Sequence, residues 1–173
     1  MKNMKSMETA ELEIRVANEK DIKVILSFIK GLAEYERLSH EVLVTEELLR
    51  DSLFGKNPVA EVIIAFEGDE PAGFALFFHN YSTFLGQKGL YLEDLFVNPD
   101  RRGHGIGKAL LAELAKIALE RNCGRLEWAV LDWNEPAINF YKSLNAKLMD
   151  EWRTFRVTGE ALETLAKGGR QAN

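Results

Sequence analysis

Three glycines at alternate positions, Gly103, Gly105 and Gly107, stand between an apolar segment and a strongly amphipathic one. The apolar segment, residues 89–97, reads as a central strand covered on both faces, and residues 108–121 carry apolar side chains at helical spacing. Glycines in such a strand-to-helix turn let backbone N–H groups approach a ligand without a Cβ in the way. The start of the helix adds free N–H groups and the positive end of its dipole. The turn therefore predicts a site for an anion such as a diphosphate.

The spacing within this turn excludes two common nucleotide sites. A Walker loop requires Ser or Thr after its lysine to hold magnesium, but Ala109 follows Lys108. A dinucleotide site requires its glycine fingerprint in the first strand-to-helix turn, with an acidic residue after the next strand, and neither condition holds. A diphosphate without obligatory magnesium fits better, and coenzyme A carries such a group. A glycine cluster that serves only the loop is the alternative.

Periodicity along the rest of the chain predicts a mixed sheet covered by helices, which is an α/β fold. Besides the strand at 89–97, alternating apolar residues predict strands at 12–16, 59–66, 72–78, 125–131, 147–149 and 152–157. Helical spacing predicts further helices from 19 to about 38, from 46 to about 53, from 135 to about 144, and from 158 onward. The early strands form an antiparallel hairpin, and the later ones alternate with helices. We therefore expect about seven strands with helices on both faces.

Composition narrows the class of protein. The chain has 173 residues, about one domain's worth, and 22 basic against 27 acidic side chains argue against nucleic-acid binding. No apolar run is long enough for a membrane span, the N-terminus lacks a secretory signal pattern, and the single cysteine excludes an internal disulfide. The three histidines show no metal-ligand spacing, so no metal is expected. We expect a cytoplasmic protein with one domain over 11–167 and flexible termini at 1–10 and 168–173.

Two motifs resemble the GCN5-related N-acetyltransferases, the GNAT superfamily. Arg102-x-x-Gly105-x-Gly107 follows an apolar strand that ends Phe96-Val97-x-Pro99, and residues 133–142 are similar to the second cofactor segment of that superfamily. Residues 32–36, 91–94 and 132–136 further resemble the diamine (spermidine/spermine) acetyltransferases and the thialysine acetyltransferases. The resemblance implies the GNAT fold, a mixed, mostly antiparallel sheet in which a splayed parallel pair of strands binds acetyl-CoA.

The resemblance also implies direct transfer of an acetyl group from acetyl-CoA, the cosubstrate, to a primary amine. It places the pantetheine arm on the backbone of Leu95, Phe96 and Val97. It assigns the diphosphate to the turn and helix start, at Arg102, Gly103, His104, Gly105, Ile106, Gly107 and Lys108. Further cofactor contacts are implied at Asn134, which by spacing is also a helix N-cap, and at Pro136, Ala137 and Tyr141.

Glu93 and Asp94 are adjacent carboxylates inside an apolar strand. A buried unpaired carboxylate is costly, so the pair marks a candidate site, although pairing with a buried arginine or capping of a loop is the alternative. Successive strand residues point to opposite faces, so without a bulge only one of the two faces a given cleft. The resemblance implies that Glu93 is the general base, acting through water, and that Asp94 is an acid on the substrate side.

Tyr141 lies on the helix predicted from 135, where spacing alone favours a tyrosine packed in the core. The resemblance instead implies that Tyr141 is the general acid for the sulfur of coenzyme A, and a phenol is able to donate to a thiolate.

The resemblance implies an acceptor groove lined by Tyr35 and Glu36 beside Glu93 and Asp94, and Glu127, Trp128 and Glu151 are further acceptor candidates. Without the resemblance, the acidic cluster at 34–36 is a solvated helix face. Such a groove suits a small cationic amine of the diamine or polyamine type. The chain departs from the polyamine enzymes at residues 81–84, where those enzymes carry an acidic residue and a tryptophan. Ser82 and Thr83 offer no charge partner for a second ammonium, which favours a thialysine- or lysine-like acceptor.

Two other expectations follow. A module that binds coenzyme A as a sensor, without catalysis, is the competing interpretation, and the presence of both Glu93 and Tyr141 favours the enzyme. The resemblance also implies a homodimer that pairs through the edge strand predicted at 152–157. The expected partner besides a second copy is a small-molecule amine, not a nucleic acid or a membrane.

Overall fold

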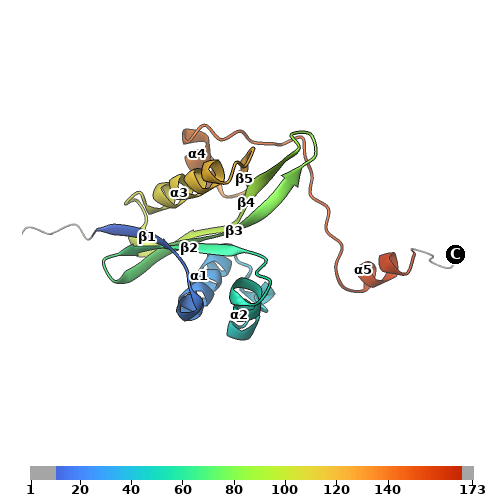
Figure 1. Ribbon diagram of the computed structural model, residues 1–173, viewed down its shortest axis with the longest axis horizontal. Coiled ribbons are helices and arrows are strands. Elements are labelled where there is room, and N and C mark those ends of the chain that lie inside the picture. Colours follow the sequence, from blue (N-terminus) through green and yellow to red (C-terminus); the bar gives the residue numbers. More distant parts are fainter. Residues whose placement is uncertain (1–10, 169–173) are drawn as a thin grey trace, which may run out of the picture. The chain divides into compact units, whose positions relative to one another are not determined.

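The computed structural model describes residues 11–168, which divide into two compact units with the boundary between Ala129 and Val130 (Figure 1). The first unit holds the sheet and the helices that cover it, and the second holds two helices. One domain over 11–167 stays a prediction.

The first unit contains a five-stranded sheet in the order β1-β2-β3-β4-β5. Its strands are β1 (Leu12–Val16), β2 (Glu61–Glu67), β3 (Glu70–Ser82), β4 (Gln87–Val97) and β5 (Leu126–Trp128). The first four pair antiparallel, and β4 pairs parallel with β5. This arrangement confirms the predicted mixed, mostly antiparallel sheet with one parallel pair.

Helices cover both faces of this sheet, with α1 and α2 on one side and α3 on the other (Figure 1). In chain order the helical elements are η1 (Glu19–Asp21), α1 (Ile22–Tyr35), η2 (Ser39–Glu41), α2 (Glu46–Phe54), η3 (Pro99–Arg101) and α3 (Ile106–Glu120). The first of them begins at a capping box, because the Asn18 side chain accepts from Lys20 N and Asp21 accepts from Asn18 N. Arg15 of β1 holds the Asp21 carboxylate with two bonds of 2.8 and 2.9 Å, which ties the helix start to the sheet.

The core between α1, α2 and the sheet sets the position of α1 over β4. Phe28 of α1 stacks on Phe74 of β3 with the ring centroids 5.3 Å apart. Gly31 permits the closest approach, because a Cβ at this position would lie 2.8 Å from Phe96 Cζ of β4. The apolar side chains that share this cluster are buried, and each of those larger than alanine contributes roughly 1.5–3 kcal/mol. They are Ala17, Ile22, Ile25, Phe28, Leu49, Leu53, Val62, Ile64, Phe74 and Phe96.

The second unit contains α4 (Glu135–Ser143) and α5 (Gly159–Ala166). The strands predicted at 147–149 and 152–157 are wrong, since the described part of this unit contains helices and turns but no strand. The apolar side chains that suggested them, Met149, Trp152 and Phe155, are exposed. A strand forms only against a partner strand, and alternation cannot show whether one is present. Residues 11–168 therefore have five strands and not about seven. None of the helices in this range is long and apolar enough to cross a membrane.

Candidate active site

The adjacent carboxylates Glu93 and Asp94 lie at a β-bulge of β4. Asp94 is opposite Leu76 of β3 and Leu92 is opposite Phe77, so Glu93 is the extra residue without a partner in β3. A bulge interrupts the alternation of faces and bends the strand locally. Alternation therefore no longer restricts a cleft to one of the two carboxylates, although of the pair only Asp94 lines the pocket described below.

The bulge also changes which neighbours share a face with Asp94. Tyr91 is opposite Phe78, and Asp94 is opposite Leu76, two residues away on β3. Alternate residues of β3 share a face, so Tyr91 and Asp94 lie on the same side of the sheet although three residues separate them. Burial raises the pKa of the Tyr91 phenol, and the charge of Glu93 raises it further. Glu93 thus acts electrostatically on both Tyr91 and Asp94 of β4.

The parallel pair opens immediately after this point. β5 pairs with β4 only from Leu90 to Leu92, where Leu92 is opposite Trp128. Within residues 11–168, no strand continues beside Glu93–Val97 on that side of β4. The backbone of Leu95, Phe96 and Val97 therefore lies along an open sheet edge, which is the setting in which an amide-rich chain adds as a further strand.

The glycine turn follows at the end of β4. Gly103 and Gly105 have φ values of 83° and 84°, and no atom lies within 4 Å of the place that a Cβ would take at either residue. Left-handed backbone of this kind favours glycine. α3 begins at Ile106, two residues earlier than predicted, so the N–H groups of Ile106, Gly107 and Lys108 are those of its first turn. The open cradle and these donors fit a diphosphate.

The charged residues around the turn do not all face this cradle. Arg101 pairs with Glu67 at the end of β2, with 2.7 Å between Nη1 and Oε2. His104 Nδ1 lies 3.7 Å from the other oxygen of the same carboxylate. Glu67 thus ties the glycine turn to the β2–β3 hairpin.

Arg102 is directed toward α1. Its guanidinium carbon lies 4.7 Å from the ring centroid of Tyr35 and 5.6 Å from that of Phe96, and its Nε donates to Val97 O at 3.0 Å. The resemblance assigned this side chain to the cofactor, but in the structure it contacts two aromatic rings and the end of β4.

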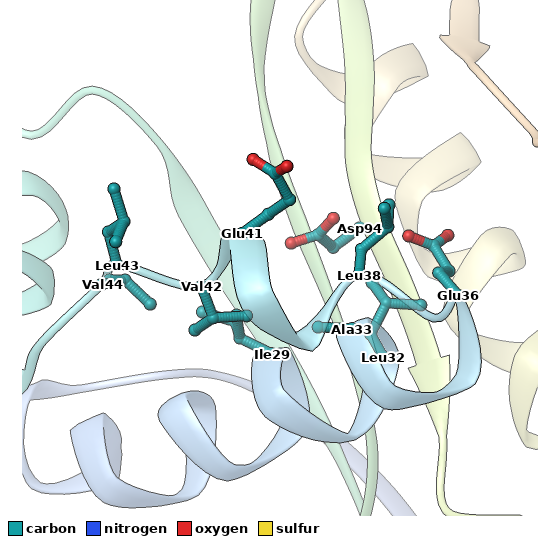
Figure 2. Close-up of a pocket in the computed structure, with 10 residues that line it drawn as sticks. All are labelled: Ile29, Leu32, Ala33, Glu36, Leu38, Glu41, Val42, Leu43, Val44 and Asp94. Atoms are coloured by element: carbon teal, nitrogen blue, oxygen red, sulfur yellow. The ribbon is translucent and has the colours of Figure 1, made fainter.

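A pocket of about 400 Å³ lies between the end of α1, the segment that follows it, and β4 (Figure 2). Three carboxylates line it, from Glu36, Glu41 and Asp94, and the remaining wall is apolar. The apolar lining residues are Ile29, Leu32, Ala33, Leu38, Val42, Leu43 and Val44. Among the residues that the structure describes, no basic side chain is part of the lining, so the pocket suits a small cation with an apolar stem.

Burial and neighbouring charges change the acidity of this pocket. Burial, with the charges of Glu93 and Glu36, raises the pKa of Asp94 from 3.8 to about 6. Burial likewise raises the pKa of Glu36. A positive ligand would offset the repulsion among these groups and lower both pKa values, because it favours the charged carboxylates.

Replacement of Asp94 by asparagine is expected to stabilise the fold at pH 8 by about 2 kcal/mol in the free energy of unfolding. Asp94 has a higher pKa in the folded chain than in the unfolded one. Its contribution to stability is therefore fully present below about pH 4 and is lost as the pH rises through about 6. Urea unfolding at pH 8 and at pH 4 measures the difference between variant and parent. A gain of equal size at both pH values would contradict the assignment of the shift to Asp94.

The acceptor candidates on β5 already have partners. Glu127 Oε2 lies 2.7 Å from Arg125 Nε and accepts from Asn80 Nδ2 at 3.0 Å. Trp128 is opposite Leu92, at the last paired position before the parallel strands separate. Glu127 thus acts as part of a polar cluster beside Tyr91, and its role toward an acceptor stays a prediction.

The remaining predicted site residues belong to the second unit. Asn134 caps α4, with its side chain accepting from Ala137 N at 3.3 Å, and Pro136 lies in the first turn, where a missing N–H is harmless. Tyr141 lies further along α4, with its ring centroid 5.4 Å from that of Phe140, and Glu151 lies in a turn after the helix. The capping role of Asn134 is confirmed, and the cofactor and catalytic roles of these residues stay predictions.

The structure adds lining residues that the sequence reading missed. Leu38 lies at the expected end of the first helix, and Glu41 and residues 42–44 follow it in a segment without helical or alternating periodicity. Glu41 is an acidic residue directly before three apolar ones, but only the path of this segment beside α1 shows that it lines the pocket. Among the described residues, no group of three or more His, Cys, Asp or Glu side chains is placed to hold a metal ion.

Comparisons with known proteins show which family and which relatives this chain is similar to. A family model described as "Acetyltransferase (GNAT) family" matches residues 29–146. The chain is 43% identical to a thialysine N-epsilon-acetyltransferase of Mus musculus, covering 91% of this chain and 98% of that protein. It is 33% identical to an L-ornithine N5-acetyltransferase of Arabidopsis thaliana, covering 89% and 87%. A solved integron cassette protein of V. cholerae is similar over 91% of this chain and 98% of its own, with 31% identity and a TM-score of 0.76.

Proposed function

This chain belongs to the GNAT family of acetyltransferases, and we propose that it transfers an acetyl group from acetyl-CoA directly to a primary amine of a small cationic acceptor. One observation carries the proposal. An acidic pocket lined by Glu36, Glu41 and Asp94 adjoins the bulge at Glu93, where the parallel strands separate. The amine and the thioester would meet at this end of the sheet.

The cosubstrate fits the residues that are present. Backbone amides of Gly103–Lys108 would hold its diphosphate, since the left-handed glycines leave the space above them open. The open edge of β4 at Leu95–Val97 would hold its amide-rich arm. When bound, acetyl-CoA supplies an acetyl thioester, the activated group of the reaction.

The chemistry requires movement of two protons. An alkylammonium has a pKa near 10, so it must lose a proton before its nitrogen can form the new bond to the acetyl carbon. Glu93, through a water molecule, would accept that proton, while Asp94 and Glu36 attract the ammonium. As the bond from acetyl carbon to sulfur breaks, the phenol of Tyr141 would donate its proton to the thiolate. The second proton of the nitrogen, released as the amide forms, would return through water to the phenoxide.

The acceptor class rests on two kinds of support. The absence of a basic side chain from the pocket lining favours an ammonium group and an apolar stem at this point. Relatives that acetylate the side-chain amines of thialysine and ornithine favour a lysine-like acceptor, as does the pair Ser82 and Thr83 in place of an acidic residue and a tryptophan. A diamine or polyamine is the second candidate, favoured by the three carboxylates.

Release of free thiol from acetyl-CoA tests the proposal. The panel contains thialysine, lysine, ornithine, putrescine, spermidine and a lysine-containing peptide. We expect the highest kcat/KM with a lysine-like amine or a diamine and little release with the peptide. If no amine raises release above the background without acceptor, the enzyme is excluded and a non-catalytic module that binds coenzyme A takes its place.

We further propose that the chain forms a homodimer, although the strand expected to pair at 152–157 is not present. The exposed Trp152 and Phe155 in this segment are compatible with burial against a second copy. Light scattering in solution gives the mass of the assembly.

A further inference from the structure

Arg102 lies at the start of the glycine turn, yet its side chain contacts the acceptor side of the sheet. The guanidinium carbon lies over the ring of Tyr35, the last residue of α1, and near that of Phe96, while Nε donates to Val97 O. The hydrogen bond to the backbone carbonyl gives the side chain a direction, and the ring faces attract its charge.

These contacts fix the end of α1 against β4. Glu36 follows Tyr35 directly and lines the acidic pocket, and Asp94 on β4 lines it from the other side. Gly31 allows the helix to approach Phe96 closely one turn earlier. The distance between the two pocket walls therefore depends on the contacts that fix the last turn of α1. Arg102 is the residue of the glycine turn that makes such a contact, with Tyr35.

The anion cradle does not depend on this side chain. Its donors are backbone amides of the turn and of the first turn of α3, and Lys108 lies exposed in that first turn. Arg101, the neighbouring arginine, is engaged by Glu67. A diphosphate at Gly103–Lys108 would therefore be held without Arg102.

We propose that Arg102 is a positioning residue for the acceptor pocket and not a ligand of the diphosphate. Through its contact with Tyr35, it couples this pocket to the glycine turn. The proposal rests on the proposed function, because it takes the acidic pocket as the acceptor site. It predicts that a change at Arg102 alters the affinity for the amine and spares the affinity for acetyl-CoA.

The test replaces Arg102 by lysine, which keeps the positive charge and removes the planar guanidinium group. With saturating acetyl-CoA, Arg102→Lys is expected to raise KM for the amine about fivefold. Calorimetric titration with acetyl-CoA alone is expected to give a Kd within about twofold of the parent. Arg101→Lys, the matched control in the same turn, is expected to leave KM for the amine within about twofold.

A double-mutant cycle adds a measurement that needs no acceptor. Arg102→Lys and Tyr35→Ala are expected to lower Tm by less together than the sum of their separate effects, because each removes the same contact. The inference is overturned if Arg102→Lys weakens acetyl-CoA binding about tenfold, or leaves both affinities unchanged. It is also overturned if the two substitutions are additive in Tm. If the parent acetylates no amine, the proposed function fails, while calorimetry and the cycle still decide the role of Arg102.

Discussion

Replacement of Tyr141 by phenylalanine is expected to lower kcat about 100-fold while Kd for acetyl-CoA stays within about twofold of the parent. The substitution removes only the phenolic hydroxyl and keeps the ring that contacts Phe140 on α4. Without a donor, the thiolate of coenzyme A would have to leave unprotonated or take its proton from water. Steady-state thiol release between pH 7 and pH 9 measures the loss, and calorimetry measures the affinity for acetyl-CoA.

Two results would count against this role of Tyr141. Equal turnover for variant and parent across that pH range would remove Tyr141 as the acid. A large loss of acetyl-CoA affinity with unchanged kcat would make it a binding residue only, which is compatible with the cofactor contact that the resemblance implies but not with proton donation.

Replacement of Glu93 by glutamine is expected to lower kcat/KM for the amine about 100-fold at pH 7. The carboxamide keeps the size of the side chain at the bulge but cannot accept the proton of the incoming ammonium. Because a free alkylamine has a pKa near 10, the loss is expected to shrink as the pH rises toward that value and the acceptor arrives deprotonated. A pH–rate profile of variant and parent measures the change.

Glu120→Gln is the matched control for this experiment. It makes the same chemical change at an exposed position near the end of α3, and we expect its profile to follow that of the parent. A profile of Glu93→Gln that is merely scaled down by one factor at every pH would assign Glu93 to binding of the ammonium and not to proton removal.

The sequence predicted the sheet well where its pattern reflects local geometry. The glycine turn, the strand before it and the helix after it are encoded within a span of about thirty residues, and all three are present, with α3 starting two residues early. The segment at 147–157 has an apolar alternation of the same kind, but strand formation depends on a distant partner, which alternation does not report.

The candidate site was predictable in its residue types and less so in its geometry. The cost of an unpaired carboxylate pointed to Glu93 and Asp94, but the bulge that alters their faces depends on the register between β3 and β4. Glu41 lines the pocket because of the path that the segment after α1 takes. Arg102 contacts the Tyr35 ring and donates to the Val97 carbonyl, which lie within its reach. Such contacts depend on packing among segments far apart in the chain.

A crystal structure of the protein with coenzyme A tests the central claim most directly. The account predicts the diphosphate on the backbone amides of Gly103–Lys108, the pantetheine arm along Leu95–Val97, and the sulfur within hydrogen-bond reach of the Tyr141 hydroxyl and next to the pocket lined by Asp94. A cofactor bound away from the glycine turn, or one whose sulfur lies remote from both Tyr141 and this pocket, would contradict it.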